Sequence, residues 1–218
     1  GWRRGRWKQE RKSLEERTGL MTFMSSPMRP QDFLTPEEFA HLKAACKDDR
    51  ERAIVLTLAG TGMRVNELCN LRVEDLDIEH GYIHVEVAKG GRPRTVVSPK
   101  PTLDALQVHL HGREARFVFL GCQDGHISTR QVQRLLDEIA TRAGLQDERP
   151  VLQRIRKRIS PHLLRHSAAS WWLDAGIHIG DVAGQLGHAS LSTTTRYVDR
   201  APNHRRESFR RAGVDKIL

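Results

Sequence analysis

The sequence predicts an α+β fold: a mostly helical domain with one small three-stranded antiparallel sheet. Two patterns support this prediction. Apolar residues recur at helical spacing through most of the chain, whereas between Leu76 and Val97 the period changes to two residues. No internal repeat interrupts the arrangement. We therefore expect several helices with the sheet inserted after the third.

Composition excludes several classes of protein. Of the 218 residues 38% are hydrophobic, enough for a core, so a wholly disordered chain is excluded. No run of about 18 uncharged apolar residues exists, which excludes a membrane-spanning helix, and no apolar stretch follows the basic N-terminus, which excludes a secretory signal. Cys46, Cys69 and Cys122 lack the paired spacing of a zinc site or a disulfide framework. We expect reduced thiols and a cytoplasmic protein, associated with the nucleoid in a prokaryotic cell.

Positive charge lies at the two ends of the chain. The formal net charge is +9, to which residues 1–12 contribute +5 and residues 200–211 contribute +4, while residues 13–199 sum to zero. Two basic arms on a neutral body suit the binding of a polyanion. For residues 1–20 a solubilising or tag-derived origin is an equal alternative, because a chain that starts at Gly1 has been processed, tagged or cut from a longer one.

Residues 1–33 read as a basic arm and linker, since they lack sustained apolar periodicity. The folded body begins at Thr35, an N-cap hydroxyl followed by Pro36 at the first helical position and by Glu38 three residues after the cap. A second, deeply buried helix is expected from about residue 50 to 59.

Thr61 and Gly62 break the helical pattern, and a short helix is expected at about residues 65–71. A strand follows, then a turn at residues 89–93 and a returning strand at residues 95–97, which predicts an antiparallel hairpin. In the first strand Tyr82, His84 and Glu86 alternate with Ile83, Val85 and Val87.

Helical periodicity returns in the C-terminal half of the chain. One helix is expected after Pro101 and another after Ser128, which is spaced to form a capping box with Gln131. A basic loop is expected at residues 144–159, and the remaining helices at about residues 160–175, 179–186 and 192–198.

Two arginines and a histidine are placed to bind a phosphate. Arg64 follows the break at Gly62 and starts a helix whose first N–H groups are unpaired, and Glu67, three residues on, can brace its guanidinium. His162 and Arg165 are three residues apart on one helix, so both can reach a common object. Two fixed guanidinia match the two non-bridging oxygens of a phosphodiester.

Lys89 at the turn supplies a mobile ammonium, and Tyr197 supplies a phenol. Taken singly, each of these residues is more often an ordinary surface, turn or capping residue. Their order along the chain is informative, because five segments together resemble the catalytic motifs of the tyrosine recombinase (phage integrase-like) family. The five segments are Thr61–Leu68, Lys89–Gly91, Pro161–Ala169, Leu186–Ser190 and Thr193–Tyr197.

The resemblance covers about residues 33–200 and implies a tyrosine recombinase catalytic domain at residues 34–200. Such a domain cuts and rejoins DNA strands without metal, nucleotide or other cofactor. It implies that Tyr197 attacks the scissile phosphate, giving a 3′-phosphotyrosyl link and a free 5′-hydroxyl. The other implied roles are phosphate binding by Arg64, Arg165 and His188, protonation of the leaving oxygen by Lys89, proton acceptance by His162, support of Arg64 by Glu67, and orientation by His166.

A metal site is the chemical alternative. His162 and His166 are four residues apart, as in zinc-peptidase helices, but Leu163 stands where that motif needs a general-base Glu. No cluster of Asp and Glu marks a two-metal nuclease either. We therefore predict no metal.

Double-stranded DNA is the expected partner. Trp171 and Trp172 are expected to pack behind the His162 helix rather than to stack on bases. The basic turn and loop could contact phosphates, which fixes position without reading sequence, although a solvated loop is the alternative. The candidate DNA-binding residues are Arg92, Arg154, Arg156, Lys157 and Arg158.

The resemblance further implies a homotetramer on DNA. Residues 201–218, with sparse apolar anchors between arginines, are predicted to be a tail that docks on a neighbouring subunit in trans, or folds back in cis without it. The segment before Leu34 is too short for the helical core-binding domain that precedes the catalytic domain in full-length members. The chain is thus either a catalytic fragment or a minimal form that relies on a partner.

Two alternative functions stay open. A relaxing topoisomerase or a hairpin-forming resolvase would use the same cleavage chemistry, although His188 favours recombination. A non-catalytic DNA-binding module would leave the whole Arg, Lys, His and Tyr set idle.

Overall fold

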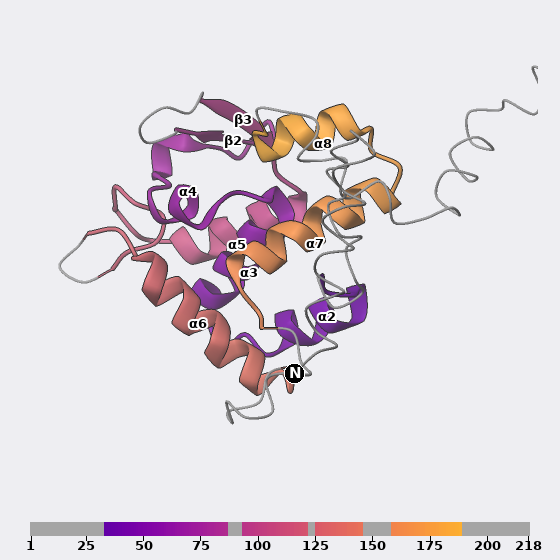
Figure 1. Cartoon of the computed structure of the whole chain (residues 1–218). Coiled ribbons are helices and arrows are strands. Elements are labelled where there is room, and N and C mark those ends of the chain that lie inside the picture. Colours follow the sequence, from indigo (N-terminus) through magenta and orange to yellow (C-terminus); the bar gives the residue numbers. More distant parts are fainter. Residues whose placement is uncertain (1–32, 87–92, 122–124, 146–157, 189–218) are drawn as a thin grey trace, which may run out of the picture.

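The computed structural model describes residues 33–86, 93–121, 125–145 and 158–188. These residues form a mostly helical body with one small sheet at its edge, which confirms the predicted fold class (Figure 1). The elements in chain order are α2 (Pro36–Ala44), α3 (Asp49–Thr61), α4 (Val65–Cys69), the 3-10 helix η2 (Val73–Asp75), β1 (Leu76–Asp77), β2 (Tyr82–Val85), β3 (Arg94–Val97), α5 (Lys100–Leu110), α6 (Thr129–Arg142), α7 (Pro161–Asp174) and α8 (Ile179–Leu186).

Helix α3 is the centre of the core. Its residues from Ala53 to Ala59 are all buried, as the nearly continuous apolar run predicts. It packs chiefly against α5 and α7 and also contacts α2, α4 and α6. Because α3 is enclosed, the chain segment that follows it, which includes Arg64, starts from a fixed point.

The helix starts follow local capping chemistry. Thr35 and Ser128 each form the predicted capping box, and Ser160 accepts a hydrogen bond from the backbone N–H of Leu163. The boundaries differ from expectation by one or two residues at α3 and α4. Helix α3 begins at Asp49 because the Asp48 side chain caps it, and α4 stops at Cys69 instead of residue 71.

The sheet has the order β1-β2-β3 with both pairs antiparallel, as predicted. In β2 the pattern of exposure alternates, with Ile83 and Val85 buried beneath the sheet and Tyr82 and His84 facing outward. Tyr82 lies opposite Val97. The turn between β2 and β3, and with it Lys89 and Arg92, lies outside the described residues.

Helix α7 is tied to the start of the folded body. The backbone N–H of Leu34 donates to Ser167 Oγ at 2.8 Å, and Trp171 Nε1 donates to the Leu34 carbonyl at 3.0 Å. Trp171 also packs on Phe39, with ring centroids 5.0 Å apart. Trp172 packs in a second apolar cluster between α7 and α8. Both tryptophans are half-buried and pack against the apolar clusters, in agreement with the predicted packing role.

Cys46 and Cys69 are free thiols, as expected, and Cys122 lies outside the described residues. Burial raises the pKa of each of the two thiols to about 11, so both are poor nucleophiles at neutral pH. No helix in the described part of the chain is long and apolar enough to cross a membrane.

Candidate active site

Arg64 is placed by the end of α3. Gly62 caps that helix in the left-handed conformation, with φ of 64°, and turns the chain so that Arg64 becomes the N-cap of α4. The Arg64 side chain is 47% exposed. Its Nη1 donates to Glu67 Oε1 at 3.1 Å and its Nη2 donates to the Gly187 carbonyl at 3.2 Å. The contact expected between Arg64 and Glu67 is therefore present, and a link to α8 accompanies it.

Glu67 is buried at the centre of a charged network. Each carboxylate oxygen accepts one hydrogen bond from Arg64 and one from Arg94: the Arg64 backbone N–H lies at 2.7 Å from Oε2, and the two Arg94 terminal nitrogens lie at 2.8 Å from the two oxygens. These four bonds fill the acceptor capacity of a carboxylate. Burial raises the pKa of Glu67, but the hydrogen bonds and charges of Arg94 and Arg64 outweigh it and hold the pKa below its usual value. Glu67 is therefore an anion at neutral pH.

Arg165 joins the ends of two helices. Its Nη1 donates to the Gly62 carbonyl at 2.6 Å and its Nη2 donates to the Leu186 carbonyl at 2.7 Å. These carbonyls close α3 and α8, where the helix dipole is negative, so a guanidinium is stabilised there. Arg165 thus brings the segment after α3 and the segment after α8 to one place.

The end of α8 places His188 beside Arg64. Gly187 adopts the left-handed conformation, with φ of 65°, and the backbone N–H of His188 donates to the Ala183 carbonyl at 3.0 Å. A Cβ on Gly187 would lie 3.0 Å from three atoms of the Arg94 side chain. His188 therefore directly follows a residue whose carbonyl accepts from Arg64 and that has little room for a side chain beside Arg94.

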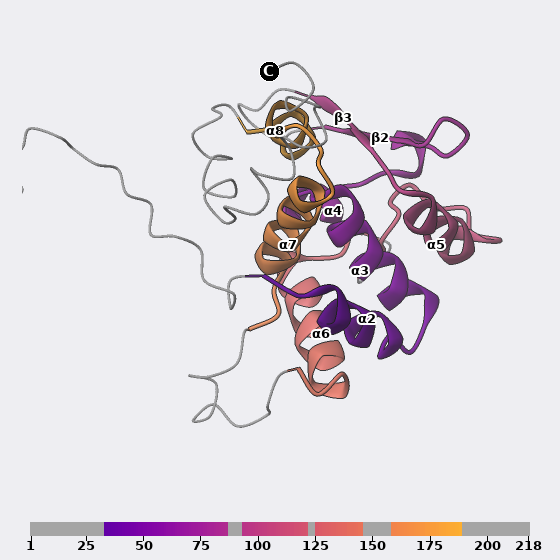
Figure 2. The same ribbon diagram turned by 90° about the vertical axis from the view of Figure 1, so that its right-hand side faces the viewer.

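Gln185 fastens α8 to the sheet, a contact that the sequence analysis missed. Its side-chain Oε1 accepts from the Val97 N–H at 3.0 Å and its Nε2 donates to the Val97 carbonyl at 2.7 Å. The amide thus occupies the outer edge of β3, where a further strand would pair. Both views place α8 beside β3 and against α7 (Figures 1 and 2).

His162 and His166 form a close pair on α7. Their Nε2 atoms are 2.5 Å apart and their rings meet edge to face, with centroids 4.0 Å apart. His162 is exposed, whereas Arg165 is buried. Side chains three residues apart on a helix point about 60° apart. His162 and Arg165 therefore do not share one face as predicted: His162 faces solvent, whereas Arg165 faces the ends of α3 and α8. Among the described residues no group of three or more His, Cys, Asp or Glu side chains is placed to hold a metal ion.

The remaining predicted residues divide into two groups. Arg158 is largely exposed, and its Nη2 lies 3.5 Å from Asp137 Oδ2. The others lie outside the described residues, namely Lys89, Arg92, Arg154, Arg156, Lys157 and Tyr197.

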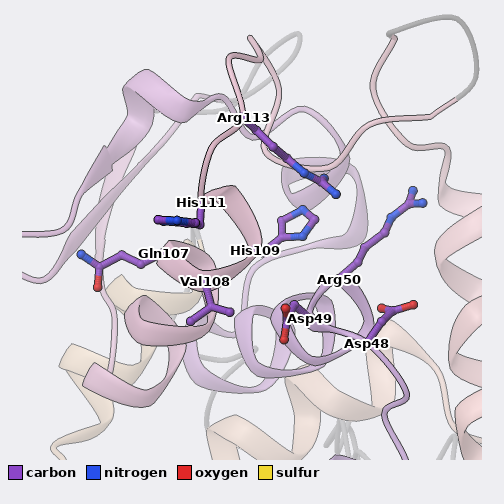
Figure 3. Close-up of a pocket in the computed structure, with 8 residues that line it drawn as sticks. All are labelled: Asp48, Asp49, Arg50, Gln107, Val108, His109, His111 and Arg113. Carbon is purple, nitrogen blue, oxygen red and sulfur yellow. The ribbon is translucent and has the colours of Figure 1, made fainter.

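A pocket of about 750 Å³ lies at the opposite end of α3 (Figure 3). Arg50 crosses it to donate to the Leu120 carbonyl, and His109 Nε2 donates to the Val118 carbonyl at 3.0 Å. None of the predicted site residues lines this pocket. Its lining is Asp48, Asp49, Arg50, Gln107, Val108, His109, His111 and Arg113.

Arg94 is the other residue of the site that the sequence analysis missed. A signal for it existed, because Arg94 is two residues before the buried Val96, and a strand period of two places it on the inward face. An inward arginine needs a carboxylate partner. Gln185 had no such local signal.

Comparison with known proteins places this geometry in a family. The family model described as "Phage integrase family" matches residues 32–204. The chain is 37% identical over 188 residues to tyrosine recombinase XerA of Pyrococcus furiosus, covering 83% of this chain and 62% of that protein. It is 35% identical over 193 residues to tyrosine recombinase XerA of Thermococcus kodakarensis, covering 85% of this chain and 64% of that protein.

Solved structures agree. A crystal structure of XerA recombinase matches with a TM-score of 0.71 and 30% identity, covering 86% of this chain and 66% of that one. The Tn1549 transposon integrase in complex with a circular intermediate DNA shares the fold, with a TM-score of 0.68, 21% identity and coverage of 89% of this chain and 68% of that one. The chain spans less than two thirds of the length of the two XerA relatives. With the motif segments at the ends of α3 and α8 joined through Arg64 and Arg165 as described, these matches establish that the chain belongs to the phage integrase family.

Proposed function

We propose that this chain carries the catalytic domain of a site-specific DNA recombinase, at residues 34–200, which cleaves and rejoins DNA strands through a 3′-phosphotyrosyl intermediate. The observation that carries the proposal is the convergence of three predicted positions distant in sequence. Arg64 binds the Gly187 carbonyl beside His188, and Arg165 binds the carbonyls of Gly62 and Leu186. A phosphate that is to gain negative charge needs such fixed donors.

The chemistry follows from these roles. The Tyr197 phenol, with an ordinary pKa of about 10, loses its proton to His162 as its oxygen bonds to phosphorus. The bond from phosphorus to the 5′-oxygen breaks, and Lys89 gives that oxygen a proton. Arg64, Arg165 and His188 bind the non-bridging oxygens throughout. Because the phosphotyrosyl link keeps the energy of the broken phosphodiester, a second 5′-hydroxyl can reverse the step without ATP or metal.

His166 supports the proton acceptor in this proposal. The two Nε2 atoms are 2.5 Å apart, so one imidazole donates its Nε2–H to the other. This contact fixes the orientation of the exposed His162 ring. For His162 to accept the proton of Tyr197, its own Nε2–H must be the donor to His166, so that Nδ1 is the acceptor nitrogen.

The assembly belongs to the same proposal. We infer double-stranded DNA as the partner, since relatives in this family are recombinases and one structural neighbour is an integrase in complex with DNA. The basic arm at residues 1–33 and the residues Arg92, Arg154, Arg156, Lys157 and Arg158 would contact phosphates. Residues 201–218 would dock on a neighbouring subunit within a tetramer on DNA, and in a prokaryotic cell this assembly would lie at the nucleoid.

A nicked suicide duplex tests the proposal. DNA duplexes that bind the chain are first selected from a pool of random sequences. Each is then nicked next to the cleavage position, so that cleavage releases a short DNA fragment that diffuses away. Religation is then impossible, and the covalent adduct accumulates. We expect an adduct on a denaturing gel that is lost in Tyr197→Phe. The chain has two tyrosines, so Tyr82→Phe, on the outer face of β2, is the matched control and should react normally. Absence of an adduct in the wild type, or its persistence in Tyr197→Phe, would refute the proposal.

A further inference from the structure

All three nitrogens of the Arg94 guanidinium are engaged within the protein. Nη1 and Nη2 each lie 2.8 Å from an oxygen of Glu67, and Nε donates to the Gln185 carbonyl at 3.2 Å. The side chain is 11% exposed. Arg165 is also buried, but its partners at Gly62 and Leu186 are neutral carbonyls, whereas the charge of Arg94 is matched by a carboxylate. We therefore do not assign Arg94 as a phosphate ligand.

Arg64 shares the same carboxylate but remains accessible. It contacts Glu67 through one terminal nitrogen at 3.1 Å, and about half of its side chain is exposed. Arg64 and Arg94 are the two cations that lie within 4.0 Å of Glu67 among the described residues. The three charges sum to +1. Without Arg94 the sum would be zero, and the buried carboxylate would cancel the charge of Arg64 at short range.

We propose that Arg94 is a positioning residue that neutralises Glu67, so that the positive charge of Arg64 remains available to the scissile phosphate. This inference rests on the proposed function. The two parallel hydrogen bonds also fix the plane of the carboxylate, which presents one oxygen to the Arg64 backbone N–H and the other to its guanidinium. Nε anchors the same group to the end of α8, where the Gly187 carbonyl binds Arg64.

The test is a double-mutant cycle on the rate of adduct formation with the suicide duplex. Arg94→Met should slow the reaction by about tenfold to a hundredfold, which is less than or equal to the lower limit of the about hundredfold to thousandfold loss seen when a donor at the reacting centre itself is removed. Adding Glu67→Gln to that variant removes the carboxylate that then cancels Arg64, so the double variant should regain most of the loss. A purely structural role for the ion pair predicts that the double variant regains stability, because Gln leaves no uncompensated buried charge. It predicts no recovery of the adduct rate per folded molecule.

Three further variants keep the test decisive. Arg94→Lys keeps the charge but loses the paired geometry, and it should react faster than Arg94→Met even if the latter folds poorly. Arg134 and Glu138 form an exposed ion pair on α6, on the opposite side of the molecule from α8 (Figure 1). Arg134→Met, alone and with Glu138→Gln, makes the same changes of net charge and controls for general DNA affinity. The folded fraction of each variant is measured by circular dichroism, and its rate is expressed per folded molecule.

The outcomes separate the inference from the function it rests on. A wild-type chain that forms no adduct overturns both. A wild-type chain that reacts, with no recovery in the double variant or with Arg94→Lys as slow as Arg94→Met, overturns the role of Arg94 alone. Recovery in the double variant at Glu67 and Arg94, but not in the pair on α6, supports it.

Discussion

Glu51 and Glu67 are buried glutamates at the same position of two successive helices, yet their contacts have different roles. Each is the third residue after an N-cap, Asp48 in α3 and Arg64 in α4, and each pairs with arginine. Glu51 is 2% exposed and binds the guanidinium of Arg142 at the end of α6 and the backbone N–H of Lys47. Its contacts hold α6 against the start of α3.

Both glutamates also have a second cation, which is exposed: Lys47 Nζ lies 3.4 Å from Glu51 Oε1, and Arg64 Nη1 lies 3.1 Å from Glu67 Oε1. A buried glutamate with an exposed cation is therefore not by itself a sign of a phosphate site. Glu67 differs in the further contact of that cation, because Arg64 also donates to the Gly187 carbonyl, next to His188. This link between two motif segments distinguishes the candidate phosphate site from the structural contact at Glu51.

Glu51→Gln should have a large effect on stability and none on chemistry. Removing one charge of a buried pair leaves the other uncompensated, and since Arg142 is about one-third exposed, we expect a loss of about 2–3 kcal/mol, at or below the low end for buried pairs. The free energy of unfolding is measured in urea. The adduct rate per folded molecule should equal that of the wild type. A fall in that rate like the one expected for Arg94→Met would erase the distinction between the two glutamates.

Gly62→Ala should have an effect on stability of similar size, and it involves the site directly. Alanine at φ of 64° costs about 1–2 kcal/mol in backbone strain. The added Cβ would also lie 2.8 Å from Leu186 and from Trp172, so overpacking should cost about 1 kcal/mol more. Because Leu186 and Gly62 both bind Arg165, we expect slower adduct formation as well.

Gly144→Ala is the matched control for that substitution. Gly144 follows α6 with φ of 68°, and a Cβ there would meet nothing within 4 Å. Gly144→Ala should therefore lower the free energy of unfolding by the backbone strain alone, with an unchanged adduct rate. Equal losses of stability in the two variants would mean that α7 and α8 adjust freely around Gly62, and that the close contact is unimportant.

The sequence predicted those features whose cause is local. The helix starts at Thr35, Ser128 and Ser160 depend on side chains within three residues, and all three are present. The hairpin depends on a period of two and is also present. The contact between Arg64 and Glu67 follows from spacing along one helical turn.

Contacts made by tertiary packing were not predictable in this way. Gln185 reaches Val97 over 88 residues of sequence, and an amide on a short helix carries no pattern that announces a strand edge. The burial of Arg165 depends on the ends of α3 and α8 meeting over it, which no segment of the sequence encodes alone. Arg94 was predictable in part: the strand period predicts its inward position, but nothing in the sequence identifies Glu67 as its partner.

The smallest expected effect is on the pH dependence of the free energy of unfolding. It concerns His109, near the start of α3, and not Glu67, which lies beyond the end of α3. Burial lowers the pKa of His109 below its ordinary value of 6.5, and the charges of Arg113 and Arg50 act in the same direction, against the hydrogen bond to Val118 and the charge of Asp48. The folded state therefore favours neutral His109. The stability that this contributes is complete above pH 6.5 and is lost as pH falls through the lower folded-state pKa.

Between pH 7.5 and 5.5 the stability contributed by neutral His109 should fall, whereas Glu67 stays ionised because its pKa lies below its ordinary value of 4.5. We expect the free energy of unfolding to fall less over that range in His109→Gln than in the wild type, since the other histidines are common to both. Equal slopes would mean that protonated His109 is tolerated in the pocket. In that event the carboxylates of Asp48 and Asp49, which line the same pocket, would be compensating it.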